Sequence, residues 1–170
     1  MKKFIPHLIA LLIFLAISAI YFSPVIGPGA KVLSAHDVDT WKGMSKEVCD
    51  HRDDTGEEAL WTKRMFSGMP AYQISTKSNG NLLQYIDKAL QLGLPRPMNL
   101  LFLYLIGFYI LLLTLKIDYR LSIVGAIGFA FSSYFLIIIQ AGHMTKAHSI
   151  AYIPLIVASV LYVFNNKKLM

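Results

Sequence analysis

The chain contains four long apolar stretches that are separated by polar segments. Residues 4–25, 97–115, 121–140 and 148–164 contain no Asp, Glu, Lys or Arg, and the last stretch is the shortest. About 20 mainly apolar residues cross the hydrocarbon core of a bilayer as a helix. The pattern therefore predicts an all-α, multi-pass membrane protein with four transmembrane helices at these positions. A hydrophobic content of 55% and a charged content of only 15% agree with this class.

The polar segments between the spans predict the topology. Residues 1–3, 116–120 and 165–170 fall on one side, and residues 26–96 and 141–147 fall on the other. The first side carries six basic residues and one acid, whereas the long segment 23–96 carries nine of each. By the positive-inside rule both termini are cytoplasmic in the cell membrane, and the long segment is extracytoplasmic. The net charge of +6 then reflects topology, and we expect membrane lipids and no nucleic acid as partners.

The first apolar stretch permits two interpretations. Its basic start "MKK" also suits a cleaved signal peptide, but the stretch is long and no clear small-x-small cleavage site ends it. We therefore expect an uncleaved signal-anchor helix.

The long extracytoplasmic segment contains two expected helices. In "DVDTWKGMSKEVCDH" apolar residues recur at helical spacing, with Asp37 or Asp39 as a possible N-cap, and "SGMPAYQIS" predicts a turn and a short extended piece. "NGNLLQYIDKALQLGLP" has one apolar stripe and stop signals at Gly93 and Pro95. We expect this second helix to lie in the membrane interface; a core helix of a small extracytoplasmic subdomain is the alternative. The single cysteine, Cys49, has no partner for an internal disulfide.

Two short polar motifs could carry chemistry. Asp37 and Asp39 alternate, so an extended backbone would point both carboxylates to one side, where they could act as a general base or bind a divalent cation. Helix capping within a solvated acidic loop is the alternative.

The second motif, "GHMTKAH", lies between the last two spans. The five-residue spacing of His143 and His148 does not suit a joint metal site, so we expect no zinc site there. Lys146 suits a phosphate group as a point charge. An interfacial turn with a snorkelling lysine is the alternative.

Four sequence features together resemble the bacterial YfhO-like membrane proteins of the C-type glycosyltransferase superfamily. They are "SAHDVDTWKGM", "LWTKRMFSGMPAYQIS", "LYLIGFYILLL" and "AFSSYFLIIIQAGHMTKAHSIAYIPL", and they span essentially the whole chain. The resemblance implies transfer of a sugar from a polyprenyl-phosphate donor on the outer membrane face. It implies that the essential acidic residue of the first loop is Asp37 or Asp39, and we favour Asp37 because it directly follows the short extended entry "KVLSAH". It also implies that His143, Lys146 and His148 bind the lipid phosphate, with no known cofactor other than a possible divalent cation.

Such transferases usually have eight or more spans, so the chain resembles an N-terminal module or a short paralogue. Two other functions stay open at this point. A non-catalytic membrane subunit could bind lipid-linked glycans or assist their passage, using Lys146 and the interfacial helix without the carboxylates. The second alternative is a truncated reading frame without independent activity.

Overall fold

The computed structural model describes residues 4–26, 36–75 and 80–166, and it is mostly helical, at 76%. The predicted helical class is confirmed. The predicted segments 1–3 and most of 165–170, together with part of 26–96, lie outside the described residues. The elements in chain order are α1 (Ile5–Ile26), α2 (His36–Thr55), β1 (Trp61–Thr62), β2 (Met69–Pro70), η1 (Ala71–Gln73), α3 (Leu83–Leu90), α4 (Met98–Thr114), α5 (Tyr119–Ala130), α6 (Ser133–Ala141) and α7 (Met144–Asn166).

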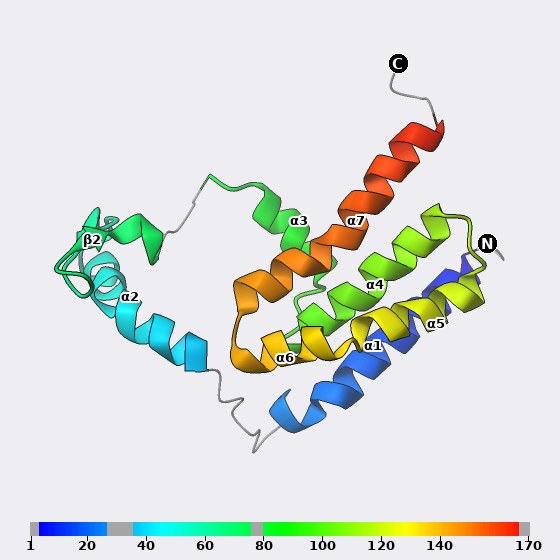
Figure 1. Cartoon of the computed structure of the whole chain (residues 1–170), viewed down its shortest axis with the longest axis horizontal. Coiled ribbons are helices and arrows are strands. Elements are labelled where there is room, and N and C mark those ends of the chain that lie inside the picture. Colours follow the sequence, from blue (N-terminus) through cyan, green and yellow to red (C-terminus); the bar gives the residue numbers. More distant parts are fainter. Residues whose placement is uncertain (1–3, 27–35, 76–79, 167–170) are drawn as a thin grey trace.

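Helix α4 forms the centre of a helical bundle with α1, α5 and α7 around it (Figure 1). Ten of its residues are buried: the continuous run from Met98 to Leu105, then Gly107 and Tyr109. The Tyr104 hydroxyl donates a hydrogen bond to the Ala147 carbonyl oxygen of α7 at 2.9 Å. A Cβ atom on Gly107 would lie 3.2 Å from the Ala151 carbonyl oxygen. The small residue at 107 therefore lets α4 and α7 approach closely.

The outer surface of the bundle is apolar. Helix α1 buries four residues that are spaced four positions apart: Ala10, Phe14, Ser18 and Phe22. It therefore packs only one narrow face against the core. On its other faces, large apolar side chains such as Leu8 are more than half exposed. A water-soluble protein would place polar residues there, whereas a bilayer accommodates apolar ones. The exposed apolar surface is thus compatible with a membrane environment.

Two described helices are long and apolar enough to cross a membrane: α1 and residues Met144–Asn165 of α7. Helices α5 and α6 pass the same test only as a pair, with a bend of 46° between them. Helix α4 is apolar but has only 17 residues. The structure therefore has two or three candidate spans.

The predicted third span, 121–140, is interrupted in the structure. Helix α5 ends at Ala130, and Ser132, with ψ of 129°, is the N-cap of α6. Serine is a favoured N-cap residue, although the Ser132 side chain forms no capping hydrogen bond here. The predicted outer loop 141–147 is also shorter, because α7 begins at Met144. Gly142 ends α6 with a φ of 89°, a left-handed conformation that glycine adopts without steric cost.

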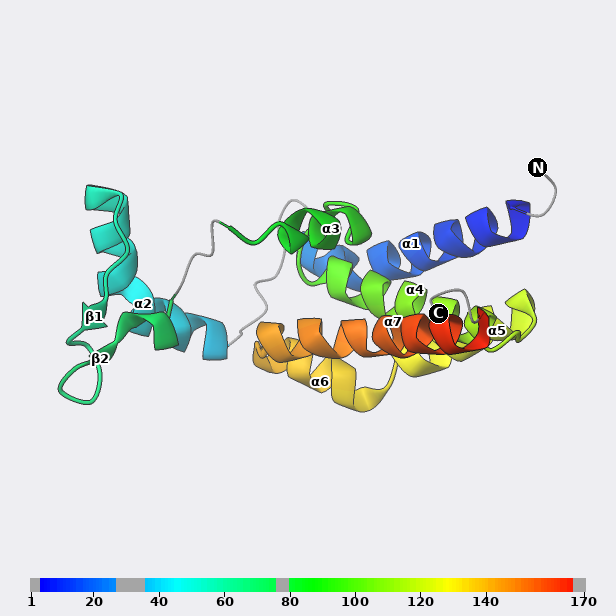
Figure 2. The ribbon, with the colours of Figure 1, turned by 90° about the horizontal axis from the view of Figure 1, so that it is seen from above.

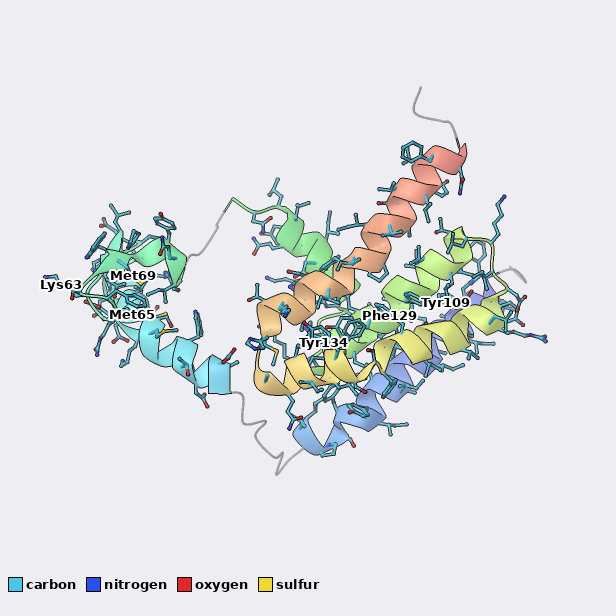
Figure 3. The ribbon with its side chains drawn as sticks, in the orientation of Figure 1. Lys63, Met65, Met69, Tyr109, Phe129 and Tyr134 are labelled. Atoms are coloured by element: carbon cyan, nitrogen blue, oxygen red, sulfur yellow. The ribbon has the colours of Figure 1, made fainter. Side chains whose placement is uncertain are left out.

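The segment between α1 and α4 contains a small separate unit, visible at one end of the molecule in Figures 1 and 2. It consists of α2, η1 and the antiparallel pair β1–β2, in which Trp61 faces Pro70. Lys63, Met65 and Met69, labelled in Figure 3, belong to this unit, whereas Tyr109, Phe129 and Tyr134 belong to the bundle. The extended piece expected at "SGMPAYQIS" is confirmed at β2, and a short 3-10 helix follows it.

Helix α3 presents its apolar side chains outward. Leu82, Leu83 and Ile86 are exposed by 75%, 69% and 58%, and α3 has no buried residue. Its polar residues Asp87 and Gln91 face the bundle instead and form hydrogen bonds there. This arrangement does not fit the core helix of a soluble subdomain, because such a helix buries its apolar face.

Candidate functional site

Asp37 lies in the first turn of α2, close to the junction between α6 and α7. Its Oδ2 atom is 2.5 Å from Nδ1 of His143, the residue between Gly142 and the start of α7. Both side chains are about half exposed, at 44% for Asp37 and 50% for His143. The structure thus brings together one residue from each of the two polar motifs.

A cavity of about 450 Å³ surrounds this contact. Arg96, which precedes α4, and Lys146, in the first turn of α7, both contribute to its wall. The complete lining consists of Asp37, Val38, Trp41, Arg96, Gly142, His143, Met144, Thr145 and Lys146. Two cationic side chains beside a carboxylate–histidine contact can hold an anionic group such as a phosphate.

Trp41 forms part of the wall on the α2 side. Its indole Nε1 donates a hydrogen bond to the Ile74 carbonyl oxygen at 2.9 Å, which connects α2 to the segment after η1. The ring remains 45% exposed. Because α2 continues as a helix through this position, Asp37 and Trp41 are one turn apart and line the same cavity.

Asp39 does not share the position of Asp37. The helix expected at "DVDTWKGMSKEVCDH" is present as α2, and both aspartates lie in its first turn, so the extended backbone that would point both carboxylates to one side does not occur. Residues two apart on a helix point in different directions. The Asp39 Oδ1 atom instead lies 3.4 Å from Lys42 Nζ, both side chains are largely exposed, and neither residue lines the cavity.

Lys146 is exposed on the first turn of α7. Its Nζ lies 5.3 Å from the centroid of the Tyr134 ring on α6, a cation–π distance. This contact holds the ammonium group near the cavity but leaves its hydrogen-bond donors available.

His148 belongs to a different cluster from His143 and Lys146. Its Nε2 atom lies 2.8 Å from Oδ1 of Asp87 on α3. The same oxygen accepts hydrogen bonds from the Tyr152 hydroxyl and the Gln91 amide, and Asn99 of α4 donates to the Gln91 carbonyl oxygen. Because a carboxylate only accepts hydrogen bonds, His148 Nε2 carries the proton of its contact. The predicted cluster of His143, Lys146 and His148 is therefore split between two places.

The Asp87 carboxylate is stabilised in its ionised form. Partial burial raises its pKa, but hydrogen bonds from Tyr152, His148 and Gln91 lower it by more, so that the pKa lies below the ordinary value of 3.8. Asp87 is thus an anion near neutral pH.

Among the described residues, no group of three or more His, Cys, Asp and Glu side chains could hold a metal ion. Each of the two aspartate–histidine contacts offers two such side chains.

Sequence reasoning missed several polar residues that the structure brings to these places. Arg96, for which no role was expected, lines the first cavity. Asp87 and Gln91 were not singled out in the sequence, and the structure turns them toward the bundle. Their four-residue spacing, together with the same spacing of His148 and Tyr152 on α7, was the available signal, because such residues share a helix face.

Comparisons of the chain with models of protein families, with curated proteins and with solved structures gave no match.

Proposed function

We propose that the protein is a multi-pass membrane protein that binds a polyprenyl-phosphate-linked sugar and transfers the sugar at the extracytoplasmic surface. The contact between Asp37 and His143, within a cavity that Arg96 and Lys146 also line, is the observation that supports this function. A carboxylate beside two cations provides both a base and a phosphate site. The resemblance to the YfhO-like family, as the N-terminal module of such a transferase, points to the same chemistry.

In the proposed topology four segments cross the bilayer: α1, α4, the α5–α6 pair and α7. Helix α4 is about 25 Å long at 1.5 Å per residue, which is close to the thickness of the hydrocarbon core. The bent pair counts as one span. Figure 2 shows at one end of the bundle the start of α1, the end of α4, the start of α5 and the end of α7. These helix ends carry or adjoin the basic residues, and we assign this end of the bundle to the cytoplasm.

The proposed reaction uses three groups of the cavity. Asp37 takes the proton from an acceptor hydroxyl, and the resulting oxygen nucleophile attacks the anomeric carbon. The bond between that carbon and the phosphate oxygen breaks through an oxocarbenium-like state, and the lipid phosphate leaves with the electron pair. Lys146 and Arg96 stabilise the negative charge of the leaving phosphate, because charge-assisted hydrogen bonds are strongest to ionised acceptors.

A second candidate is a non-catalytic subunit that binds lipid-linked glycans. One observation favours it: the Asp37 carboxylate is already 2.5 Å from a histidine nitrogen. This contact already occupies the carboxylate that sugar transfer would need as a base. Such a subunit would require Lys146 and Arg96 for binding but not Asp37 for turnover.

A comparison of Asp37→Asn with Asp39→Asn tests the proposed reaction. The two variants remove the same charge from the same helical turn, but only Asp37 lines the cavity. We expect Asp37→Asn to lower the rate of sugar transfer from a polyprenyl-phosphate-linked donor in membranes by about 10²- to 10⁴-fold, and Asp39→Asn to leave it near wild type at matched expression. Equal and small effects of both variants would contradict a catalytic role and favour the binding subunit.

A further inference from the structure

A second cavity lies between α3 and α7 and differs in chemistry from the first. Its volume is about 410 Å³, and it is lined by Asn81, Leu83, Gln84, Ile86, Asp87, His148 and Tyr152. Leu83 and Ile86 are largely exposed and belong to the outward apolar face of α3. The cavity thus connects an apolar surface with a polar cluster on the bundle side.

The polar groups of this cavity are not fully used by the protein. All three hydrogen bonds to the Asp87 carboxylate converge on Oδ1, and within the described residues Oδ2 accepts none. Asn81 uses its Oδ1 atom to accept from the Leu83 amide, which leaves its Nδ2 donor without a partner in the same part of the chain. The side-chain amide of Gln84 likewise forms no hydrogen bond to a described residue. Donors and an acceptor are therefore available to a ligand.

The charge of the lining excludes a phosphate as the preferred ligand. Among the residues that the structure describes, no lysine or arginine lines the cavity, and the ionised Asp87 carboxylate would repel an anion. Neutral amides beside a carboxylate suit hydroxyl groups, which both donate and accept hydrogen bonds. This composition contrasts with the first cavity, where Arg96 and Lys146 are present.

We propose that the cavity between α3 and α7 binds the neutral, hydroxyl-rich headgroup of a membrane lipid, such as a glycosyl diacylglycerol. In this complex Asp87 Oδ2 accepts hydrogen bonds from headgroup hydroxyls, and the Gln84 and Asn81 amides complete the polar contacts. The lipid chains lie along Leu83 and Ile86. The proposal rests on the membrane placement of the proposed function but not on its phosphate chemistry.

Direct binding of defined lipids to the purified full chain in detergent micelles, followed by native mass spectrometry or calorimetry, tests this inference. The probes are monoglucosyl diacylglycerol, diacylglycerol with the same chains, and a dioleoyl lipid with a quaternary ammonium headgroup. We expect the glucosyl lipid to bind at least about fivefold more tightly than diacylglycerol, as one or two added neutral hydrogen bonds would allow. Equal binding of these two lipids, or tightest binding of the ammonium lipid, would overturn the proposal.

Two variants locate the binding. Asp87→Asn should weaken binding of the glucosyl lipid by about tenfold or more, and Gln84→Ala by about two- to tenfold. Gln84 takes no part in the hydrogen-bond cluster between α3 and α7, so its loss leaves the attachment of α3 intact. Asp39→Asn, remote from the cavity, should bind as wild type does. Wild-type binding by Gln84→Ala would overturn the proposal even if Asp87→Asn bound weakly, because the loss would then come from the detached α3 helix.

A further variant separates this inference from the proposed function. Lys146→Gln should lower phosphate binding in the first cavity and leave the affinity for the glucosyl lipid unchanged. A parallel loss of glucosyl-lipid binding in Lys146→Gln would contradict a separate second site.

Discussion

At the residue scale, two histidines near the start of α7 each contact an aspartate from the segment between α1 and α4. His143 meets Asp37 in a cavity with two cations, and His148 meets Asp87 in a cavity whose described lining residues include no lysine or arginine. The five-residue spacing explains why they diverge: His143 precedes the helix, and His148 lies more than one turn inside it. The two aspartate–histidine contacts are therefore similar in residue type but lie in cavities of different charge.

The lowered pKa of Asp87 predicts a dependence of stability on pH. The carboxylate stabilises the folded chain fully above pH 3.8, and this contribution is lost as the pH falls through the lower pKa of the folded state. We expect Asp87→Asn to lower the free energy of unfolding by about 1.5 kcal/mol at pH 7, the low end for a hydrogen-bonded charge. Thermal unfolding in detergent at pH 7, 5 and 3.5 measures the difference from wild type.

The difference in the free energy of unfolding between wild type and Asp87→Asn should be the same at pH 7 and 5 and should shrink at pH 3.5. Asp39→Asn, an exposed carboxylate beside Lys42, provides the control for the general effect of losing a charge. If the difference in the free energy of unfolding between wild type and Asp87→Asn grew as the pH falls, it would contradict a lowered pKa of Asp87 in the folded state.

At the element scale, the bundle depends on the close approach of α4 and α7. Gly107 faces the Ala151 carbonyl oxygen, and Tyr104 donates to the Ala147 carbonyl oxygen one turn earlier on each helix. Both contacts require a small residue on one of the two surfaces. They position the start of α7, and with it His143 and Lys146, relative to the rest of the bundle.

Gly107→Leu should destabilise the bundle by about 1–3 kcal/mol, because the added side chain overpacks the interface between α4 and α7. Gly43→Leu is the matched control: a Cβ atom at Gly43 in α2 meets nothing within 4 Å. Leucine also has the higher helix propensity, so the control should not lose stability. Thermal unfolding of both variants in the same detergent measures the effect, and equal stability of the two would contradict the close approach.

Several elements could be predicted from their apolar patterns. The bounds of α1, α4 and α3 differ from expectation by about one or two residues, because the start and stop signals at these helices are local. The bend before Ser132 could not be predicted, since the apolar run continues through it and only tertiary packing decides whether two serines interrupt a helix. The early start of α7 was missed because polar residues in "GHMTKAH" suggested a loop.

The candidate site could be predicted in part. Asp37 of the first motif and His143 of the second, both singled out in the sequence, lie together in the structure. His148 lies outside the Asp37–His143 cavity, whereas Arg96 lines it. Both facts depend on how the segment between α1 and α4 folds back onto the bundle. No periodicity in a single helix contains that information, because it is a contact between segments remote in sequence.

At the scale of the whole molecule, the two ends of the bundle differ in their charged residues and in the cavities and elements that they carry. One end carries Lys116, Asp118 and Arg120 near the start of α5, and the other carries both cavities and the α2 unit. Figure 2 shows the start of α1 and the turn before α5 at the end opposite α2. If the chain crosses a membrane, the two ends face different compartments.

The orientation of these ends can be measured by cysteine labelling. Cys49 in α2 should react with a membrane-impermeant thiol reagent in intact cells, and an exposed Asp39→Cys in a Cys49→Ser background should react faster, because Cys49 is partly buried. Asp118→Cys in the same background should react only after permeabilisation. The reverse pattern would place the cavities on the cytoplasmic side and contradict the proposed topology.

The most direct measurement of the central proposal is the affinity of the purified chain for a short polyprenyl-phosphate analogue. Lys146→Gln and Arg96→Gln should each weaken binding by about ten- to a hundredfold, the loss of a charge-assisted hydrogen bond of about 1.5–3 kcal/mol. Lys42→Gln, a lysine of α2 that lines neither cavity, should bind as wild type does. Wild-type affinity in all three variants would contradict a phosphate site at the Asp37–His143 cavity.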